Sequence, residues 1–533
     1  MAAHSSTDNI TEETFLIKYK QKSDEVRDMI SKVEQDHQSL VLIDTIQRLG
    51  LGYLFQDEIE AILQHQFLAT KSAIYDRDLY KASLRFRLLR QQGYHVRPDD
   101  FGEFKEDNDG LIKFKDCLIG DTKGLMELHE ASHLSMEGED ILHEAAEFSS
   151  RHLNAKFASL NDDDEEAKIV IKDCLLYPQH KSLPQFKAKN FLDNLNGDSE
   201  WEILLQELAN LEFSLVESSH KDEILQVVKW WKGLGLSKEL KSSRDQPLKW
   251  HMWSMAILYE PTWSKHRTLL TKPISLVYAV DDIFDLYGTM DQLTLFTEAV
   301  IRWDISAAEN LPNYMKICFA AIYDTTYEIC SVVFQEYGWN PIETLRKVWG
   351  GLFNAFLVEA KWFTSGELPK AEVYLENGIV SSGVPMVLSH LFFLMGSGLT
   401  KETEILLNDS QGITYSVAKI LRLLDDLGTA QDEHQEGYDG SYVECYMKGK
   451  HVHSIEAAHE HVMTMVSDTW ENLNKQCLCS TRSFSHSLRK ACLNAARMVP
   501  TMYNYDKNHR LPLLEQHIKS MLTDTEFTSS ILE

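Results

Sequence analysis

The sequence predicts an all-α fold, and three observations lead to this prediction. The 533 residues include only 12 prolines. Long proline-free stretches carry apolar residues at helical spacing, and within residues 40–55 the positions i, i+3, i+4 and i+7 are Leu42, Thr45, Ile46 and Leu49. Alternating strand patterns bounded by Asn-Gly or Asp-Gly turns are nearly absent. We therefore expect helices of roughly 12–25 residues joined by short loops.

Chain length and one polar break predict two domains. The length exceeds that of a typical single domain. Asn, Gly, Asp and Ser interrupt the helical periodicity in NLNGDSE, residues 194–200, and the periodicity resumes from Trp201 to Leu234. We expect an N-terminal domain at residues 1–200 and a C-terminal domain at residues 201–533.

The charge balance excludes some partners. The net charge is −28, from 53 basic and 81 acidic residues, so a polyanion such as DNA would be repelled and nucleic-acid binding is not expected. The sequence contains no run of 18 apolar residues, so we do not expect a membrane span. The first twenty residues lack the apolar core of a secretory signal, and no arginine precedes Arg27. We expect a monomer in the cytosol, with free cysteine thiols.

A first acidic cluster follows an apolar stretch. Residues 272–289 read KPISLVYAVDDIFDLYGT, and the acids are Asp281, Asp282 and Asp285. Asp281 and Asp285 are spaced i and i+4, so they share one helix face. A solvated helix end fits poorly, because the residues from Ile274 to Val280 are nearly all apolar. Clustered carboxylates suit Mg²⁺, whose remaining ligands are water and substrate phosphate.

A second cluster lies at residues 421–433, LRLLDDLGTAQDE. Asp425, Thr429 and Glu433 fall at i, i+4 and i+8 and form one helix stripe that can hold another Mg²⁺. Arg422 lies near this face and can donate to a phosphate. If the two helices face each other across a bundle, their acids line opposite rims of one cavity, which suits a polyanion held by several metal ions.

The two motifs resemble those of the plant class I terpene synthases. That family carries D-D-x-x-D on one helix and (N/D)-D-x-x-(S/T)-x-x-x-E on another, and both are intact here. The resemblance covers almost the whole chain, with further matches at residues 87–94, 250–261 and 287–304. It implies a catalytically idle N-terminal α-helical barrel and a C-terminal helical bundle that ionises a prenyl diphosphate.

The resemblance also implies roles for individual residues. Three Mg²⁺ ions are expected, with Mn²⁺ as a substitute; their ligands are Asp281, Asp285, Asp425, Thr429 and Glu433. Two arginines join Asp281 and Asp285 as catalytic residues: Arg244, where family members receive the departing diphosphate, and Arg422. The expected substrate-binding residues are Arg244, Asp281, Asp285, Arg422, Asp425 and Trp253. Trp253 falls where an aromatic ring lines the pocket, and its face can stabilise a carbocation.

Several departures resemble one subfamily, which makes acyclic tertiary alcohols. Gln246 stands where cyclising members often have a second arginine, and no Arg-Arg pair precedes the first motif. The segments 381–386 (SSGVPM) and 502–509 (MYNYDKNH) are further features that resemble this subfamily. We expect linalool from geranyl diphosphate and (E)-nerolidol from farnesyl diphosphate, the latter favoured in the cytosol. Water would be oriented by a helix break at residues 378–383. The alternative is a sesquiterpene cyclase that makes cyclic hydrocarbons.

Three other interpretations are weaker. His129 and His133 belong to an H-E-x-x-H pattern typical of zinc proteases, but no third ligand is evident and a packing helix is expected. A chain-elongating prenyltransferase would carry a second D-D-x-x-D, whereas Gly428 and Thr429 follow the second acid pair here. Intact ligands at both clusters argue against a non-catalytic scaffold.

Overall fold

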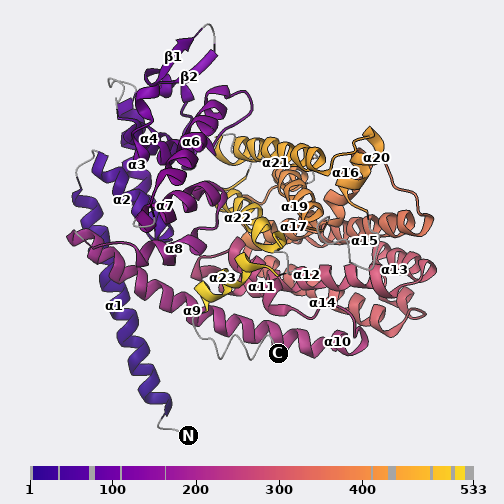
Figure 1. Cartoon of the computed structure of the whole chain (residues 1–533). Coiled ribbons are helices and arrows are strands. Elements are labelled where there is room, and N and C mark those ends of the chain that lie inside the picture. The colour runs from indigo at the N-terminus through magenta and orange to yellow at the C-terminus, as the bar shows by residue number, and fades with distance from the viewer. Residues whose placement is uncertain are drawn as a thin grey trace. The chain divides into compact units, whose positions relative to one another are not determined.

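The described part of the chain is almost entirely helical in the computed structural model (Figure 1), which confirms the all-α prediction. The chain divides into two compact units, Met1–Ser218 with Leu478–Ser480, and Ser219–Cys477 with Thr481–Glu533. The boundary predicted at residue 200 stays a prediction. The structure describes residues 4–33, 37–70, 78–108, 111–161, 164–197, 199–407, 409, 412–429, 440–479, 484–505 and 510–522.

The first unit consists of helices and one hairpin. In that hairpin β1 pairs antiparallel with β2, with Lys105 opposite Phe114. These are the only strands among the described residues, and the expectation of a wholly helical chain missed them. The elements are α1 (His4–Lys32), α2 (His37–Arg48), η1 (Gly52–Phe55), α3 (Gln56–Thr70), α4 (Leu79–Gln91), η2 (Pro98–Phe104), β1 (Lys105–Asn108), β2 (Leu111–Phe114), η3 (Asp116–Leu118), α5 (Thr122–Ser132), α6 (Asp140–Ser159), α7 (Glu165–Leu176), η5 (Gln179–Lys181) and α8 (Pro184–Asp193).

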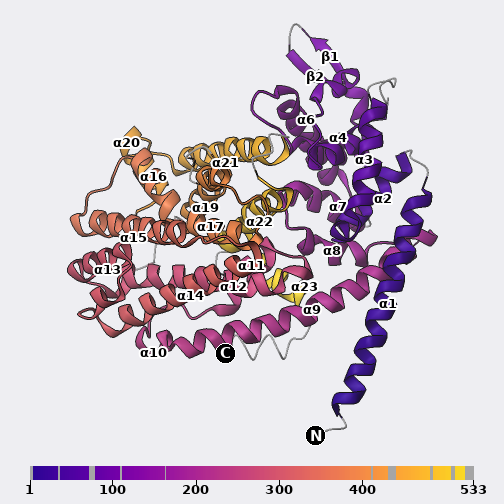
Figure 2. The ribbon, with the colours of Figure 1, turned by 180° about the vertical axis from the view of Figure 1, so that it is seen from behind.

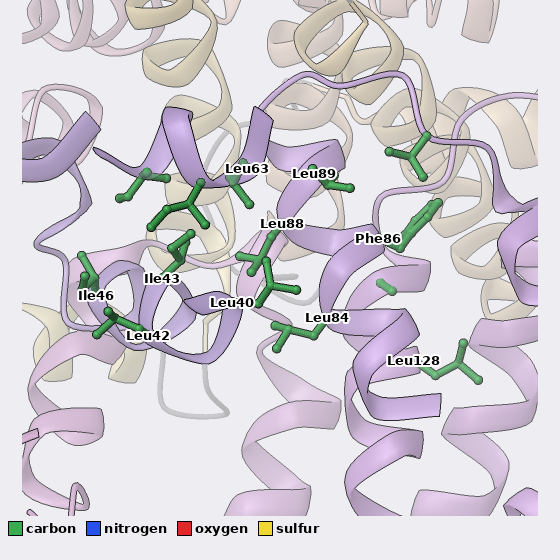
Figure 3. Packing of buried hydrophobic residues seen from close by; sticks show 14 of the residues in the cluster. Leu40, Leu42, Ile43, Ile46, Leu63, Leu84, Phe86, Leu88, Leu89 and Leu128 are labelled. Atoms are coloured by element: carbon green, nitrogen blue, oxygen red, sulfur yellow. The ribbon is translucent and has the colours of Figure 1, made fainter. Parts of the chain in front are cut away.

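Packing of α2 against α4 builds part of the core of the first unit. Leu40 of α2 lies beside Leu84 and Leu88 of α4 (Figure 3), and all three side chains are buried. The predicted helical spacing in α2 is confirmed, because Leu42 and Ile46 are buried as well. Burying a leucine or isoleucine side chain contributes about 1.5–3 kcal/mol, so this seam is a main source of the unit's stability.

Helix α9 (Glu200–Leu234) begins in the first unit and ends in the second. Its 35 residues exceed the expected helix length. No proline interrupts it, and its first glycine is Gly233, so no residue within it favours an earlier end.

The second unit is a helical bundle in which α19 packs beside α22 (Figures 1 and 2). Its elements after α9 are α10 (Leu236–Glu239), α11 (Pro247–Ile257), η6 (Pro261–Trp263), α12 (Ser264–Asp282), η7 (Ile283–Tyr287), α13 (Met290–Arg302), η8 (Ile305–Ala308), α14 (Asn313–Tyr337), α15 (Ile342–Ser365), α16 (Ala371–Ser381), α17 (Val384–Met395), α18 (Lys401–Leu406), α19 (Ile413–Thr429), α20 (Tyr442–Lys450), α21 (Ile455–Leu478), α22 (His486–Tyr503) and α23 (Pro512–Met521).

Two described segments of the bundle, Asn313–Tyr337 and Ala371–Met395, are long and apolar enough to cross a membrane by length and composition alone. The most apolar window of the first is 50% buried inside the fold, and that of the second is 72% buried. Core helices have this composition too, so packing within the bundle is sufficient to explain both segments.

A buried ion pair joins α9 to α12 within the second unit. Glu223 accepts hydrogen bonds from Arg267 Nε at 2.8 Å and Nη2 at 2.6 Å, and its Oε2 lies 3.2 Å from His251 Nε2. Arg267 Nη1 also donates to the carbonyl oxygen of Leu258 at 2.7 Å. Burial alone would raise the pKa of Glu223, but the hydrogen bonds from Arg267 and His251 hold it below its usual value.

We predict that Glu223→Gln lowers the free energy of unfolding by about 3–5 kcal/mol, because it leaves a buried guanidinium without its counter-charge. The depressed pKa means that the ion pair stabilises the fold above pH ~4.3, the pKa of an unfolded glutamate, and less so as the pH falls below it. Thermal unfolding followed by circular dichroism measures the change.

The matched control is Glu328→Gln. Glu328 pairs with Lys272 at 2.6 Å, but its side chain is 45% exposed, so the change should cost at most about 1 kcal/mol. Equal melting temperatures for the two variants would contradict the importance of the buried pair.

Candidate active site

The second unit contains a cavity of about 610 Å³. Its wall combines residues from helices that are distant in sequence, among them α11, α12, α15 and α19. Both acidic clusters reach this cavity, as expected for helices that face each other across a bundle. Six of the predicted site residues line it, and their roles remain predictions: Arg244, Trp253, Asp281, Asp285, Arg422 and Asp425.

Two predicted metal ligands are not placed. Thr429 is the last residue of α19, but its side chain is not described, and Glu433 lies outside the described residues. Nowhere in the described ranges, this cavity included, do three His, Cys, Asp or Glu side chains converge on one point where a metal ion would bind. Asp281, Asp285 and Asp425 instead distribute hard oxygen donors around the cavity, and these are the ligands that Mg²⁺ prefers.

The first acidic cluster does not lie on one regular α-helix. Helix α12 ends at Asp282, and Asp285 belongs to the π-helical turn η7, which the Gly288 N–H closes on the carbonyl oxygen of Ile283 at 2.9 Å. The prediction of a single α-helical face was wrong here, because a π-turn has more residues per turn. Asp281 and Asp285 still line the same cavity.

The middle acid of this cluster holds Arg244. Asp282 is 4% exposed and accepts hydrogen bonds from the Arg244 backbone N–H at 2.8 Å and from Nε at 2.7 Å. Arg244 Nη2 donates to Asp281 at 2.5 Å. Burial raises the pKa of Asp282, and the charge of Arg244 opposes this rise. Asp282 is therefore an anchor for the guanidinium, which it holds in the cavity wall.

The second cluster repeats this arrangement. Asp426 is fully buried and accepts a hydrogen bond from Arg422 Nε at 2.8 Å and another from the Tyr442 backbone N–H, also at 2.8 Å. Arg422 Nη2 lies 2.9 Å from Asp425. Gly378 permits this placement, because a Cβ there would come 2.7 Å from Arg422 Cδ. In each cluster a buried aspartate therefore holds one arginine next to the neighbouring aspartate, which lines the cavity.

Aromatic side chains form another part of the wall. The indole N–H of Trp253 donates to the Tyr278 hydroxyl at 3.1 Å, and the Trp253 ring lies 6.4 Å from that of Tyr503. Burial raises the pKa of both tyrosines, so they stay neutral at physiological pH. Lys249 also lines the cavity, and burial together with the charge of Arg244 lowers its pKa to about 8. The sequence analysis identified only Trp253 among these.

The expected helix break separates α16 from α17. Gly383 has a φ of +73°, and a Cβ there would approach Val277 Cγ1 to 2.8 Å, so both conformation and space require glycine. Pro385 has no N–H, so the carbonyl oxygen of Ser381 cannot receive the usual helical hydrogen bond from it. Ser381, Ser382 and Gly383 all line the cavity, which places polar atoms of the break on its wall.

Glu359 is a wall residue that the sequence analysis missed. It lies on α15, and its carboxylate accepts hydrogen bonds from Ser381 Oγ at 2.6 Å and Asn377 Nδ2 at 3.0 Å. It belongs to neither acidic motif. A charged residue within the apolar segment FNAFLVEAKWF was the available signal.

The histidine pair of the zinc-protease pattern lies in the first unit. His129 and His133 have their Nε2 atoms 3.3 Å apart, and His129 Nδ1 contacts Ser149 Oγ at 3.3 Å. Glu130 accepts a hydrogen bond from the Gln179 backbone N–H at 2.6 Å. Among the described residues no third His, Cys, Asp or Glu joins the pair, and His129 and Glu130 of α5 are both buried.

Known proteins share both halves of this architecture. The family model for the terpene synthase N-terminal domain matches residues 1–175, and that for the terpene synthase family metal-binding domain matches residues 232–472. An (E)-nerolidol synthase of Cannabis sativa is 48% identical over 94% of this chain and 91% of its own length. A chloroplastic tricyclene synthase of Antirrhinum majus is 45% identical over 91% of this chain and 84% of its own.

A solved structure has the same fold as this chain. Isoprene synthase from grey poplar leaves (Populus x canescens), in complex with three Mg²⁺ ions and dimethylallyl-S-thiolodiphosphate, superposes with a TM-score of 0.87 at 33% identity, over 96% of this chain and 98% of its own. Sequence and structure agree across both units. The chain therefore belongs to the terpene synthase family and is an enzyme of that family.

Proposed function

We propose that this enzyme ionises geranyl diphosphate, farnesyl diphosphate or both, and that water captures the cation to give an acyclic tertiary alcohol. The products would be linalool and (E)-nerolidol respectively. The observation that carries this proposal is that Asp281, Asp285, Asp425, Arg244 and Arg422 all line the same cavity. The 48% identity to an (E)-nerolidol synthase supports the acyclic product.

Magnesium fits the donor chemistry of the wall. Asp281 and Asp285 would hold two ions and Asp425, with Thr429 and Glu433, a third; Mn²⁺ is an expected substitute. The isoprene synthase complex, which contains three Mg²⁺ ions, supports this number. Bound Mg²⁺ would neutralise the diphosphate and improve it as a leaving group.

Arg244 and Arg422 supply positive charge to a strongly acidic chain. A guanidinium can donate two parallel hydrogen bonds to a phosphate, and a rigidly held donor loses little freedom when it binds. Asp282 and Asp426 hold these two groups in the cavity wall. We propose that both arginines bind the diphosphate as the carbon–oxygen bond breaks.

The remaining wall suits the hydrocarbon part of the substrate. Phe284, Phe356 and Phe363 line the cavity together with Trp253, and their faces can stabilise a cation where little water competes. The break between α16 and α17 adds polar atoms beside these rings. We propose that water bound near Ser381 adds to the tertiary carbon, C3.

A cyclase is the second candidate. The tricyclene synthase at 45% identity has a cyclic product in its name, and the same ionisation would precede either outcome. Gln246, in place of a second arginine, favours the acyclic product.

We expect the purified protein with Mg²⁺ to convert farnesyl diphosphate mainly to nerolidol and geranyl diphosphate mainly to linalool. Mass spectrometry of the volatile products measures this. Geranylgeranyl diphosphate serves as the length control, and excess EDTA should abolish all turnover, because the diphosphate then lacks its counter-ions. Mainly cyclic hydrocarbons would contradict the proposed product.

Replacement of Asp281 by Ala should reduce turnover by more than about 100-fold, because loss of a metal ligand should exceed the 10–100-fold typical of its outer-shell partners. Release of diphosphate gives the rate, and circular dichroism should show unchanged helicity. Asp291→Ala, at an exposed acid at the start of α13, is the control. Full activity of Asp281→Ala would refute the assigned role.

Gly378→Ala should displace Arg422 and lower kcat at least about tenfold, since small misplacements of catalytic groups can cost 10²-fold. Gly351→Ala is the matched control: this glycine is exposed on α15, and an added Cβ meets nothing within 4 Å. It should leave kcat unchanged and stabilise the helix by up to ~1 kcal/mol. Equal kcat values for the two variants would show that Arg422 needs no such space.

A further inference from the structure

Glu359 is held beside the helix break by two hydrogen bonds. Ser381 Oγ and Asn377 Nδ2 both donate to the same oxygen, Oε1, at 2.6 and 3.0 Å. Asn377 is itself fixed, because its amide also donates to the carbonyl oxygen of Ala355 at 3.1 Å. The carboxylate therefore has a defined position relative to the end of α16.

The second oxygen of this carboxylate is differently placed. Oε2 has no hydrogen-bond partner in the described part of the chain, and Glu359 forms no ion pair with any described Lys or Arg. Asp281 and Asp425, by contrast, each contact an arginine within 3 Å. Glu359 thus lines the cavity with one anchored oxygen and one that can accept a hydrogen bond from a ligand.

Both apolar side chains and charged groups surround Glu359. Phe356, Ala360 and Phe363 of the same helix line the cavity next to it, and Val384 lines it beyond the break. Burial raises the pKa of Glu359, and the charge of Asp281 adds to the rise, whereas the charge of Arg422 and the hydrogen bonds from Ser381 and Asn377 oppose it. An ionised carboxylate oxygen that keeps free lone pairs can accept a hydrogen bond from a bound water and then its proton.

We propose that Glu359 binds and deprotonates the water molecule that captures the allylic cation. This inference rests on the proposed water-capture function. The water oxygen forms the C–O bond at C3 with a lone pair, one of its O–H bonds breaks, and the proton passes to Oε2. The products are the neutral tertiary alcohol and a protonated Glu359, which returns its proton to solvent when the alcohol leaves.

In this role Glu359 is needed for alcohol formation but not for ionisation. If Glu359 cannot accept the proton, the cation still forms but loses a proton of its own and gives an acyclic hydrocarbon. Glu359→Gln tests this, because the amide oxygen keeps the shape and can still accept hydrogen bonds from Ser381 and Asn377. The ratio of alcohol to hydrocarbon should fall about tenfold, less than the 10²–10⁴ typical of general bases, because a carbocation reacts readily with water.

The experiment measures diphosphate release and the volatile products of the full-length enzyme with Mg²⁺ and farnesyl diphosphate. Diphosphate release by Glu359→Gln should stay within about threefold of the parent. Glu376→Gln removes an equal charge from the exposed side of α16 and should change neither quantity.

The outcomes distinguish this inference from the function on which it rests. A parent enzyme that makes no tertiary alcohol would overturn both. A parent that makes alcohol while Glu359→Gln keeps the same product ratio would overturn only the role of Glu359 and would assign the proton to another acceptor, such as the departing diphosphate. If Glu359→Gln lowered the yields of alcohol and hydrocarbon equally, the proposed role of Glu359 would also be overturned. Its contacts would then be purely structural.

Discussion

The site depends on two buried aspartates that each hold an arginine at the cavity wall. Asp282 is 4% exposed and Asp426 is 0% exposed, and a buried carboxylate without a counter-charge is strongly destabilising. Each is paired with a guanidinium, Arg244 or Arg422, and each accepts a backbone N–H as well. The fold itself therefore requires both arginines, and their position for anion binding follows from packing.

This arrangement reconciles an acidic protein with an anionic ligand. The chain carries −28 net charges, yet the cavity wall presents two fixed cations. Their guanidinium groups also contact Asp281 at 2.5 Å and Asp425 at 2.9 Å. A metal ion held by either acid would share that carboxylate with an arginine, so the metal ligands and the phosphate donors of this wall lie side by side.

The sequence predicted the all-α class, and it predicted that acids of both motifs would line one cavity, as Asp281, Asp285 and Asp425 do. Motif spacing is local and the helices between are strongly periodic, so both features could be read from the chain. The sequence did not predict the π-turn at Ile283–Tyr287, which depends on a backbone hydrogen bond that side-chain identity does not encode. The roles of Asp282 and Asp426 depend on burial, which spacing does not reveal. The hairpin was detectable, since positions 109 and 110 of the sequence read Asp-Gly, a dipeptide typical of hairpin turns. Glu359 required the tertiary contact with Ser381.

The π-turn also restricts how this segment can change during evolution. One residue fewer between Asp281 and Gly288 would close the turn as a regular α-helix and rotate everything after it by about 100°. Point substitutions would leave the π-helical turn in place, whereas a deletion would change the direction of every side chain that follows it. The first motif therefore restricts the length of this segment as much as the identity of its residues. We expect related chains to tolerate substitutions at its apolar positions but no insertion or deletion.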